Sequence, residues 1–195
     1  MSQIEQEPVA EYMMRTRERV EQEMAGLTPE QLGFRAGAGR WTIAEVMEHV
    51  ATVEEFFLRQ RLPALPAAPP PPPDHPRAEL DERIRAEAPQ RLQRFETPEV
   101  FQPKGQMSAA EALERFRAAR EALVKFARQP GCDLRAHCMP HRILTGPGTP
   151  GVLDGCQWLL AIAAHSLRHA EQMAEVKRQG GYPKASAIGS GAQAN

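Results

Sequence analysis

The sequence lacks a net excess of charge, a long apolar run and an apolar leader. Its 195 residues carry 24 Lys and Arg against 25 Asp and Glu, and no block of basic residues stands out. This balance argues against a nucleic-acid or membrane surface as partner. No run approaches the roughly 18 apolar residues of a membrane-spanning helix. The acidic start MSQIEQEPVAEYMMR has no apolar core, so we do not expect a signal peptide.

Cysteine is also scarce. The three cysteines, Cys132, Cys138 and Cys156, are odd in number and lack the spacing of a disulfide framework. This predicts free thiols and a location in a reducing cytoplasm. No Ser-His-Asp or Cys-His arrangement indicates nucleophilic catalysis, and Cys156 lies more than two helical turns before His165.

The sequence does contain four long amphipathic stretches. Apolar residues recur at three- and four-residue steps over residues 9–25, 42–61, 109–128 and 151–177. This period predicts helices, and neither a credible strand nor an internal repeat accompanies them. We therefore predict an all-α fold, a four-helix bundle. Its length suits a single domain over residues 1–183, followed by a disordered tail at 184–195.

A proline-rich segment separates the second and third predicted helices. Residues 63–76 contain eight prolines in fourteen residues. They predict a solvent-exposed, polyproline-II-like segment with no buried apolar side chain. At about 3.1 Å per residue it spans about 40 Å, enough to cross over along a 20-residue helix of roughly 30 Å. A flexible loop at one end of the bundle and a ligand for an SH3-type domain are the alternatives. A weak helix over 77–95, interrupted at Pro89, follows it.

Three histidines lie within the apolar faces of the predicted helices. His165 and His169 are four residues apart, so their imidazoles lie on one side of a helix about 6 Å apart. His49 occupies the middle of the apolar face of the second helix. The midpoints of two facing helices lie at a similar height along the bundle axis. The three imidazoles can therefore bind one divalent metal and leave one of its coordination positions open. The alternative is that they are partly buried core histidines.

Other polar residues have less specific patterns. Glu45 lies one turn before His49 and could orient it. It also completes a capping box with Thr42, and we prefer this structural role for Glu45. Gln172 is a candidate hydrogen-bond partner for His169. Arg168 is expected either to lie at the rim of the pocket or to form an ion pair between helices. A second histidine group over 137–141 is a weak metal site, because Pro140 prevents the helical register that would align its histidines.

Two segments resemble the DinB/YfiT-like superfamily. They are LTPEQL…GRWTIAEVMEHV over 27–50 and QWLLAIAAHSLRHAEQMAEV over 157–176. The resemblance implies an up-down-down-up bundle, consistent with a crossover, and a divalent metal on His49, His165 and His169. It also implies that members of known function are thiol S-transferases or isomerases that use bacillithiol or mycothiol.

We therefore expect a metal-dependent enzyme, most simply a low-molecular-weight-thiol S-transferase. A metal-dependent hydrolase and a non-catalytic bundle with a structural metal are the alternatives. Zinc, nickel, iron and manganese all accept imidazole, so the sequence does not select the metal. We also expect a homodimer, because surplus apolar residues lie on the helices (Met14, Val124, and Phe57 beside Phe56).

Overall fold

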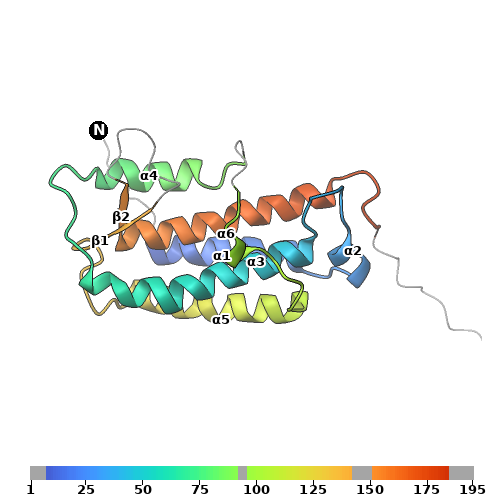
Figure 1. Cartoon of the computed structure of the whole chain (residues 1–195), viewed down its shortest axis with the longest axis horizontal. Coiled ribbons are helices and arrows are strands. Elements are labelled where there is room, and N and C mark those ends of the chain that lie inside the picture. The colour runs from blue at the N-terminus through green and yellow to red at the C-terminus, as the bar shows by residue number, and fades with distance from the viewer. Residues whose placement is uncertain (1–7, 92–95, 142–150, 185–195) are drawn as a thin grey trace, which may run out of the picture.

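The computed structural model describes residues 8–91, 96–141 and 151–184. Its main body is a bundle of four helices: α1 (Val9–Met24), α3 (Ile43–Phe56), α5 (Ala109–Arg128) and α6 (Gly155–Lys177) (Figure 1). α1 and α6 run in one direction and α3 and α5 in the other, which is the up-down-down-up order. α1 packs mainly on α6, and α3 on α5, so each principal pair is parallel. The all-α four-helix bundle is thus confirmed.

Capping boxes determine where two of the bundle helices begin. At the start of α3, the Thr42 hydroxyl accepts from the Glu45 N–H at 3.2 Å, and Glu45 Oε2 accepts from the Thr42 N–H at 2.7 Å. α6 begins at Gly155, four residues later than predicted. The reason is that Asp154 and Gln157 form the same reciprocal pair there, at 2.9 and 3.0 Å.

The core consists of two apolar clusters separated by a buried polar layer. Arg120 of α5 donates to Met13 O and Thr16 Oγ1 of α1, each at 2.8 Å, and to Ser166 Oγ of α6 at 2.9 Å. It also forms an ion pair with Glu54 of α3, with 3.2 Å between Arg120 Nε and Glu54 Oε2. On α1, α5 and α6 the residue of this layer lies between members of the two clusters, and on α3 Glu54 lies between Ala51 of one cluster and Phe57, just past the helix end, of the other. One polar network therefore joins all four helices.

The crossover between α3 and α5 takes a different form from the predicted one. α3 continues as a π-helical turn, η1 (Phe57–Arg61), and a 3-10 turn, η2 (Leu62–Ala67). The chain then passes along one end of the bundle to α4 (Arg77–Glu87), which packs on α6 (Figure 1). α4 and the following segment, with the 3-10 turn η3 (Glu99–Phe101), return the chain to the start of α5. The proline run itself does not cross over along the bundle.

The prediction that residues 63–76 bury no apolar side chain is wrong. Leu65 is completely buried, because η2 turns it toward the start of α6. A Cβ built on Gly155 would lie 2.6 Å from Leu65 Cδ2, so a glycine is needed at that position. The His75 side chain is buried as well, with its Nε2 at 2.8 Å from Gln157 Oε1. Leu65 and His75 therefore anchor this segment to the end of the bundle, while most of its other residues are exposed, as predicted.

Two short strands, absent from the prediction, close the same end. β1 (Cys138–Pro140) and β2 (Val152–Asp154) pair in antiparallel orientation. Three residues are too few to show the alternation that identifies a strand from sequence. His137 donates from Nδ1 to a backbone carbonyl at 2.7 Å, and the ring of His141 lies edge-on to Trp158. These two histidines thus have different neighbours, and the segment between them is a strand rather than a helix.

Three further expectations concern the chain as a whole. Cys132, Cys138 and Cys156 are all free, as predicted. Within the described ranges, no helix is long and apolar enough to cross a membrane. Of the tail predicted at 184–195, only Lys184 belongs to the described residues. A single helical turn, α2 (Pro29–Gly33), lies between the first two long helices.

The apolar side chains on which the homodimer prediction was based are largely buried within a single chain. Phe57 and Val124 are buried, and Met14 packs against the core. In the part of the chain that the structure describes, Val100 is the one large apolar side chain that is exposed, at 61%. The homodimer stays a prediction, and these side chains no longer support it.

Candidate metal centre

The structure brings the three predicted histidines together in the interior of the bundle. His49 comes from the middle of α3, and His165 and His169 from successive turns of α6. One ring nitrogen of each lies within 4.8 Å of those of the other two. His49 Nε2 and His165 Nε2 are 3.1 Å apart. Two imidazole nitrogens bound to one ion at about 2.0–2.1 Å lie at a similar separation, so the cluster has the dimensions of a metal site.

The outer nitrogens of two of these rings have fixed partners. His49 is only 4% exposed, and its Nδ1–H donates to the Phe101 carbonyl at 2.7 Å. His169 is 8% exposed, and its Nδ1–H donates to Gln172 Oε1 at 2.9 Å. Because a neutral imidazole carries one hydrogen, both rings must present the lone pair of Nε2 to the cluster. This is the tautomer that a metal ligand requires.

His165 completes the cluster from a less buried position. Its Nδ1 is buried and has no hydrogen-bond partner among the described residues. Its Nε2 hydrogen-bonds the bare Nε2 of His49, so without a further group the one hydrogen of His165 lies on Nε2 and is shared between the two rings. This arrangement leaves the buried Nδ1 of His165 as a lone pair without a donor, whereas a cation would be bound by one ring nitrogen of each histidine in place of the shared hydrogen. The residues present therefore fit a divalent metal.

The protonation state of the cluster also suits a metal. Burial lowers the pKa of His49, against a smaller opposite effect of the Phe101 carbonyl. Burial, and then the neighbouring imidazoles, lower the pKa of His165 and of His169 well below its ordinary value. All three rings are thus held neutral at neutral pH, with lone pairs available for coordination.

Comparison with known proteins identifies the family. The sequence model of the DinB superfamily matches residues 12–173, which include all three histidines. The chain belongs to the DinB superfamily. It is 24% identical over 161 residues to the uncharacterized protein YuaE of Bacillus subtilis (strain 168), covering 80% of this chain and 90% of YuaE.

The fold of this DinB-superfamily protein resembles a solved structure. That structure is YfiT from Bacillus subtilis, described as a probable metal-dependent hydrolase with an unusual four-helix bundle topology. The match has a TM-score of 0.58 and 15% sequence identity, and covers 91% of this chain and 89% of YfiT. At this identity the likeness concerns the fold alone.

The other residues singled out from the sequence have different positions. Gln172 contacts His169, as expected for a partner of a ligand. Glu45 belongs to the helix start, where it accepts from Thr42 and pairs with Arg35 at 2.7 Å. Arg168 is partly buried, and burial followed by the charge of Arg91 lowers its pKa. Gln172 is thus the one of the three for which a hydrogen bond to a histidine of the cluster is seen among the described residues.

Several groups near the cluster were not predicted. The Phe101 carbonyl on His49 comes from η3, in the crossover. Trp41 forms a wall, with its ring centroid 5.1 Å from that of His49 and stacked at 6.5 Å on His169. Its position directly before the N-cap residue of α3 could have indicated this, whereas no sequence pattern marks a backbone carbonyl.

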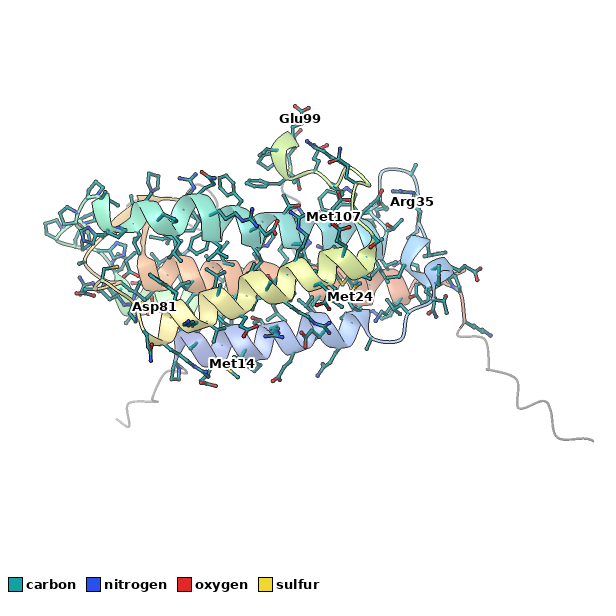
Figure 2. The ribbon with its side chains drawn as sticks, turned by 90° about the horizontal axis from the view of Figure 1, so that it is seen from below. Met14, Met24, Arg35, Asp81, Glu99 and Met107 are labelled. Carbon is teal, nitrogen blue, oxygen red and sulfur yellow. The ribbon has the colours of Figure 1, made fainter. Side chains whose placement is uncertain are left out.

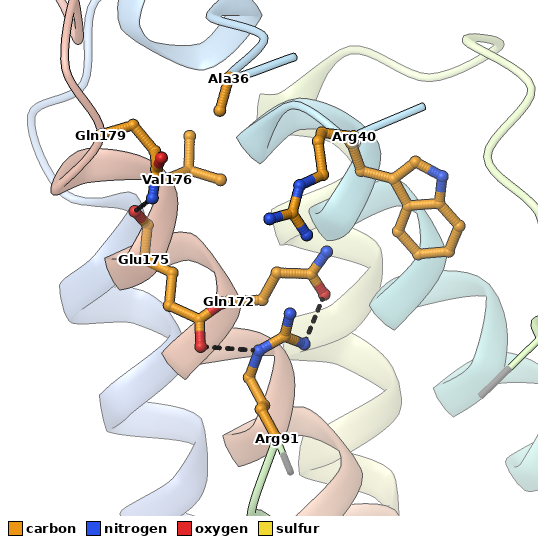
Figure 3. A pocket seen from close by; sticks show the side chains of 8 residues that line it. Ala36, Arg40, Arg91, Gln172, Glu175, Val176 and Gln179 are labelled. Carbon is orange, nitrogen blue, oxygen red and sulfur yellow. Dashed lines mark hydrogen bonds and ion pairs between the residues drawn. The ribbon is translucent and has the colours of Figure 1, made fainter. Parts of the chain in front are cut away.

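A small pocket lies beside these groups (Figure 3). Arg91 crosses it, donating to Gln172 Oε1 at 3.1 Å and pairing with Glu175 at 3.0 Å. Arg40 points into the same space. The pocket is lined by Ala36, Arg40, Trp41, Arg91, Gln172, Glu175, Val176 and Gln179. Two of these residues, Trp41 and Gln172, also contact His169, so the pocket adjoins the histidine cluster.

Proposed function

We propose that this DinB-superfamily protein is a metal-dependent enzyme in which His49, His165 and His169 hold one divalent cation. The observation that carries the proposal is the convergence of three neutral imidazoles, two with Nδ1–H fixed by an outside acceptor. When bound, such a cation would act as a Lewis acid and lower the pKa of a small thiol or water beside it. Zinc, nickel, iron and manganese all suit imidazole ligands.

We further propose that the co-substrate is a low-molecular-weight thiol and the reaction an S-transfer. Two of the protein's three thiols are poor nucleophiles, because burial raises the pKa of Cys138 and of Cys156 to about 11. The third, Cys132, packs against the apolar cluster that contains Leu134. A nucleophilic sulfur would therefore come from outside. The pocket with Arg40 and Arg91 offers two guanidinium groups, with Glu175 as counter-charge, to an anionic part of that thiol.

Hydrolysis is the second candidate, since YfiT is described as a probable metal-dependent hydrolase. A hydrolase of this kind uses a general base near the water. The two carboxylates closest in sequence to His49 are engaged elsewhere: Glu45 with Arg35, and Glu48 with backbone N–H groups. This favours S-transfer over hydrolysis.

Metal content tests the ligand set. Purified wild-type protein is expected to contain one divalent metal per chain, and His49→Ala and His169→Ala proteins well below that. His137→Ala is the matched control, because His137 lies at the strand end of the bundle with its own partner. Wild-type metal content in either cluster variant would overturn the assignment.

The reaction class has its own test. Cobalt-substituted protein is titrated with small thiols, and a change in its visible spectrum is expected when the thiol sulfur binds. Consumption of thiol is then measured with an activated aryl halide, against ester hydrolysis without thiol. A full metal complement with a silent spectrum and no turnover would instead support a metal that only joins α3 to α6.

A further inference from the structure

The residue before His49 has an unusual set of partners. Glu48 is 5% exposed, and no Lys or Arg of the described ranges pairs with it. Its carboxylate accepts from three successive backbone N–H groups, those of Lys104 at 3.2 Å, Gly105 at 2.9 Å and Gln106 at 3.3 Å. A buried carboxylate is tolerated when such hydrogen bonds replace its hydration. Glu48 is therefore bound to the crossover rather than to another helix.

The backbone of the crossover is shaped for this carboxylate. Gly105 has φ +66°, in the left-handed region that glycine adopts without strain. Such a turn directs consecutive N–H groups into one concave site for an anion. A side chain at Gly105 would meet no neighbouring atom, so its conformation, not space, is what favours glycine there.

The same crossover segment supplies the acceptor for His49. Figure 2 shows the segment with Glu99 and Met107 lying over α3. Within it, the Phe101 ring packs edge-on to Phe56 at 5.0 Å, and the Phe101 carbonyl accepts from His49 Nδ1–H. Glu48 holds the segment only three to five residues further along the chain.

We infer that Glu48 is a positioning residue for the metal centre. By binding the N–H groups of residues 104–106, it keeps the Phe101 carbonyl at His49 Nδ1, and so keeps Nε2 of His49 directed at the metal. This inference rests on the proposed function in that His49 is taken as a ligand. Replacing outer partners of metal-bound histidines typically reduces metal affinity by about 10–100-fold.

The test compares Glu48→Gln and Glu48→Ala with Glu55→Gln. Glu55 is another carboxylate on α3, partly buried, but its partners are Arg115 of α5 at 3.1 Å and Arg59 at 3.6 Å. Metal affinity is measured by competition with a chelator for the metal alone. We expect a loss of about tenfold or more for Glu48→Ala, a smaller loss for Glu48→Gln, and a change of less than about twofold for Glu55→Gln.

A second variant protects the test against misfolding. Gly105→Ala leaves the carboxylate intact but strains the turn that receives it, and we expect a loss of metal affinity in the same direction. Wild-type affinity in Gly105→Ala and in a folded Glu48→Ala would overturn the inference, leaving Glu48 with a role in stability only.

A readout without metal separates this inference from the proposed function. In metal-free protein, ¹⁵N NMR of the His49 ring is expected to show hydrogen on Nδ1 in wild type and in Glu55→Gln. Glu48→Ala is expected to show a mixture of tautomers. If wild-type protein binds no metal, the proposed function fails while this measurement still decides the role of Glu48. An unchanged His49 tautomer in Glu48→Ala would count against that role.

Discussion

The outer partners of the two fixed imidazoles are both neutral oxygens. His49 donates to the Phe101 carbonyl and His169 to the Gln172 amide. A carboxylate in either place would make the imidazole a more basic ligand. Arg91 also donates to Gln172 Oε1, which draws further electron density from that oxygen. A cation held here would keep most of its positive charge, which suits Lewis-acid chemistry.

His141 is expected to make the protein sensitive to acid. Burial, and then the charge of Arg61, lower its pKa to about 4 in the folded protein. A histidine in the unfolded chain has a pKa of about 6.5. As pH falls, the unfolded chain therefore binds a proton first, and stability is lost between about pH 6.5 and pH 4 but not above that range. The pKa difference corresponds to at most about 3.5 kcal/mol.

The variant His141→Phe tests this expectation, because it keeps an aromatic ring against Trp158 but cannot titrate. Its free energy of unfolding, measured in urea at pH 7, 5.5 and 4.5, is expected to fall less with acid than that of wild type. Equal acid sensitivity in the two proteins would contradict the prediction.

The sequence could identify the three histidines but only part of their surroundings. Their faces follow from helical spacing, which places His165 beside His169 and His49 in an apolar stripe. The contact between Gln172 and His169 could be predicted for the same reason, because the two residues are three apart on one helix. The Phe101 carbonyl lies 52 residues from His49, and a backbone group carries no residue-type signal. Its position depends on the path of the crossover, which no local pattern determines.

Among the secondary-structure elements, the long helices were predictable and the connections were not. The Thr42–Glu45 capping box gave the start of α3 directly. The late start of α6 at Gly155 follows from an Asp154–Gln157 box whose pattern was present but unused. The eight prolines of residues 63–76 predicted an exposed connection. One side chain of this segment, that of Leu65, is nevertheless buried, because η2 directs it into the core. Composition describes the average of a segment and cannot detect one anchoring residue.

Leu65 is therefore expected to stabilise the connection strongly. Leu65→Ala removes a completely buried side chain beside Gly155, and we expect a loss of about 2–4 kcal/mol in the free energy of unfolding. Val100→Ala, at an exposed position of the same crossover, is the control and should change it by less than about 0.5 kcal/mol. Chemical denaturation measures both. An equally small effect at Leu65 would mean that the segment is not anchored.

For the molecule as a whole, the polar layer at mid-bundle limits how the helices can pair. Arg120 reaches three other helices, and a helix shifted by one turn would leave its guanidinium or the Glu54 carboxylate buried without partners. Such a pair adds little net stability compared with apolar residues, but separating its members is costly. The layer thus favours one alignment of the four helices over its neighbours.

Removing one member of this pair is expected to be much worse than removing both. Arg120→Met leaves Glu54 buried and unpaired, and we expect a loss of about 3–5 kcal/mol. Combining it with Glu54→Leu should recover a large part of that loss. Thermal and urea unfolding of both single variants and the double variant measure the difference. Additive losses would indicate that the two side chains do not act as a pair.

Metal removal is expected to lower the thermal stability of the whole bundle. At a free metal concentration of 100 times Kd, binding adds about 2.7 kcal/mol. For a chain of this length, that corresponds to a change in Tm of roughly 5–10 °C. Calorimetry at pH 8 with and without chelator measures it, and His49→Ala protein should not respond. An equal response in that variant would place the metal elsewhere.

The parallel packing of α1 on α6 has a consequence for the order of events during synthesis. During synthesis, α1 finds its main neighbour only after the other three bundle helices have been made, because α6 follows all of them in the sequence. Until then the apolar face of α1 is exposed, and His49 lacks the other two histidines of the cluster, His165 and His169, because they have not yet been synthesised. Contacts so distant in sequence form late and slowly. A prematurely terminated chain would thus be unable to sequester a metal, and loading of the centre would report that translation had passed residue 169.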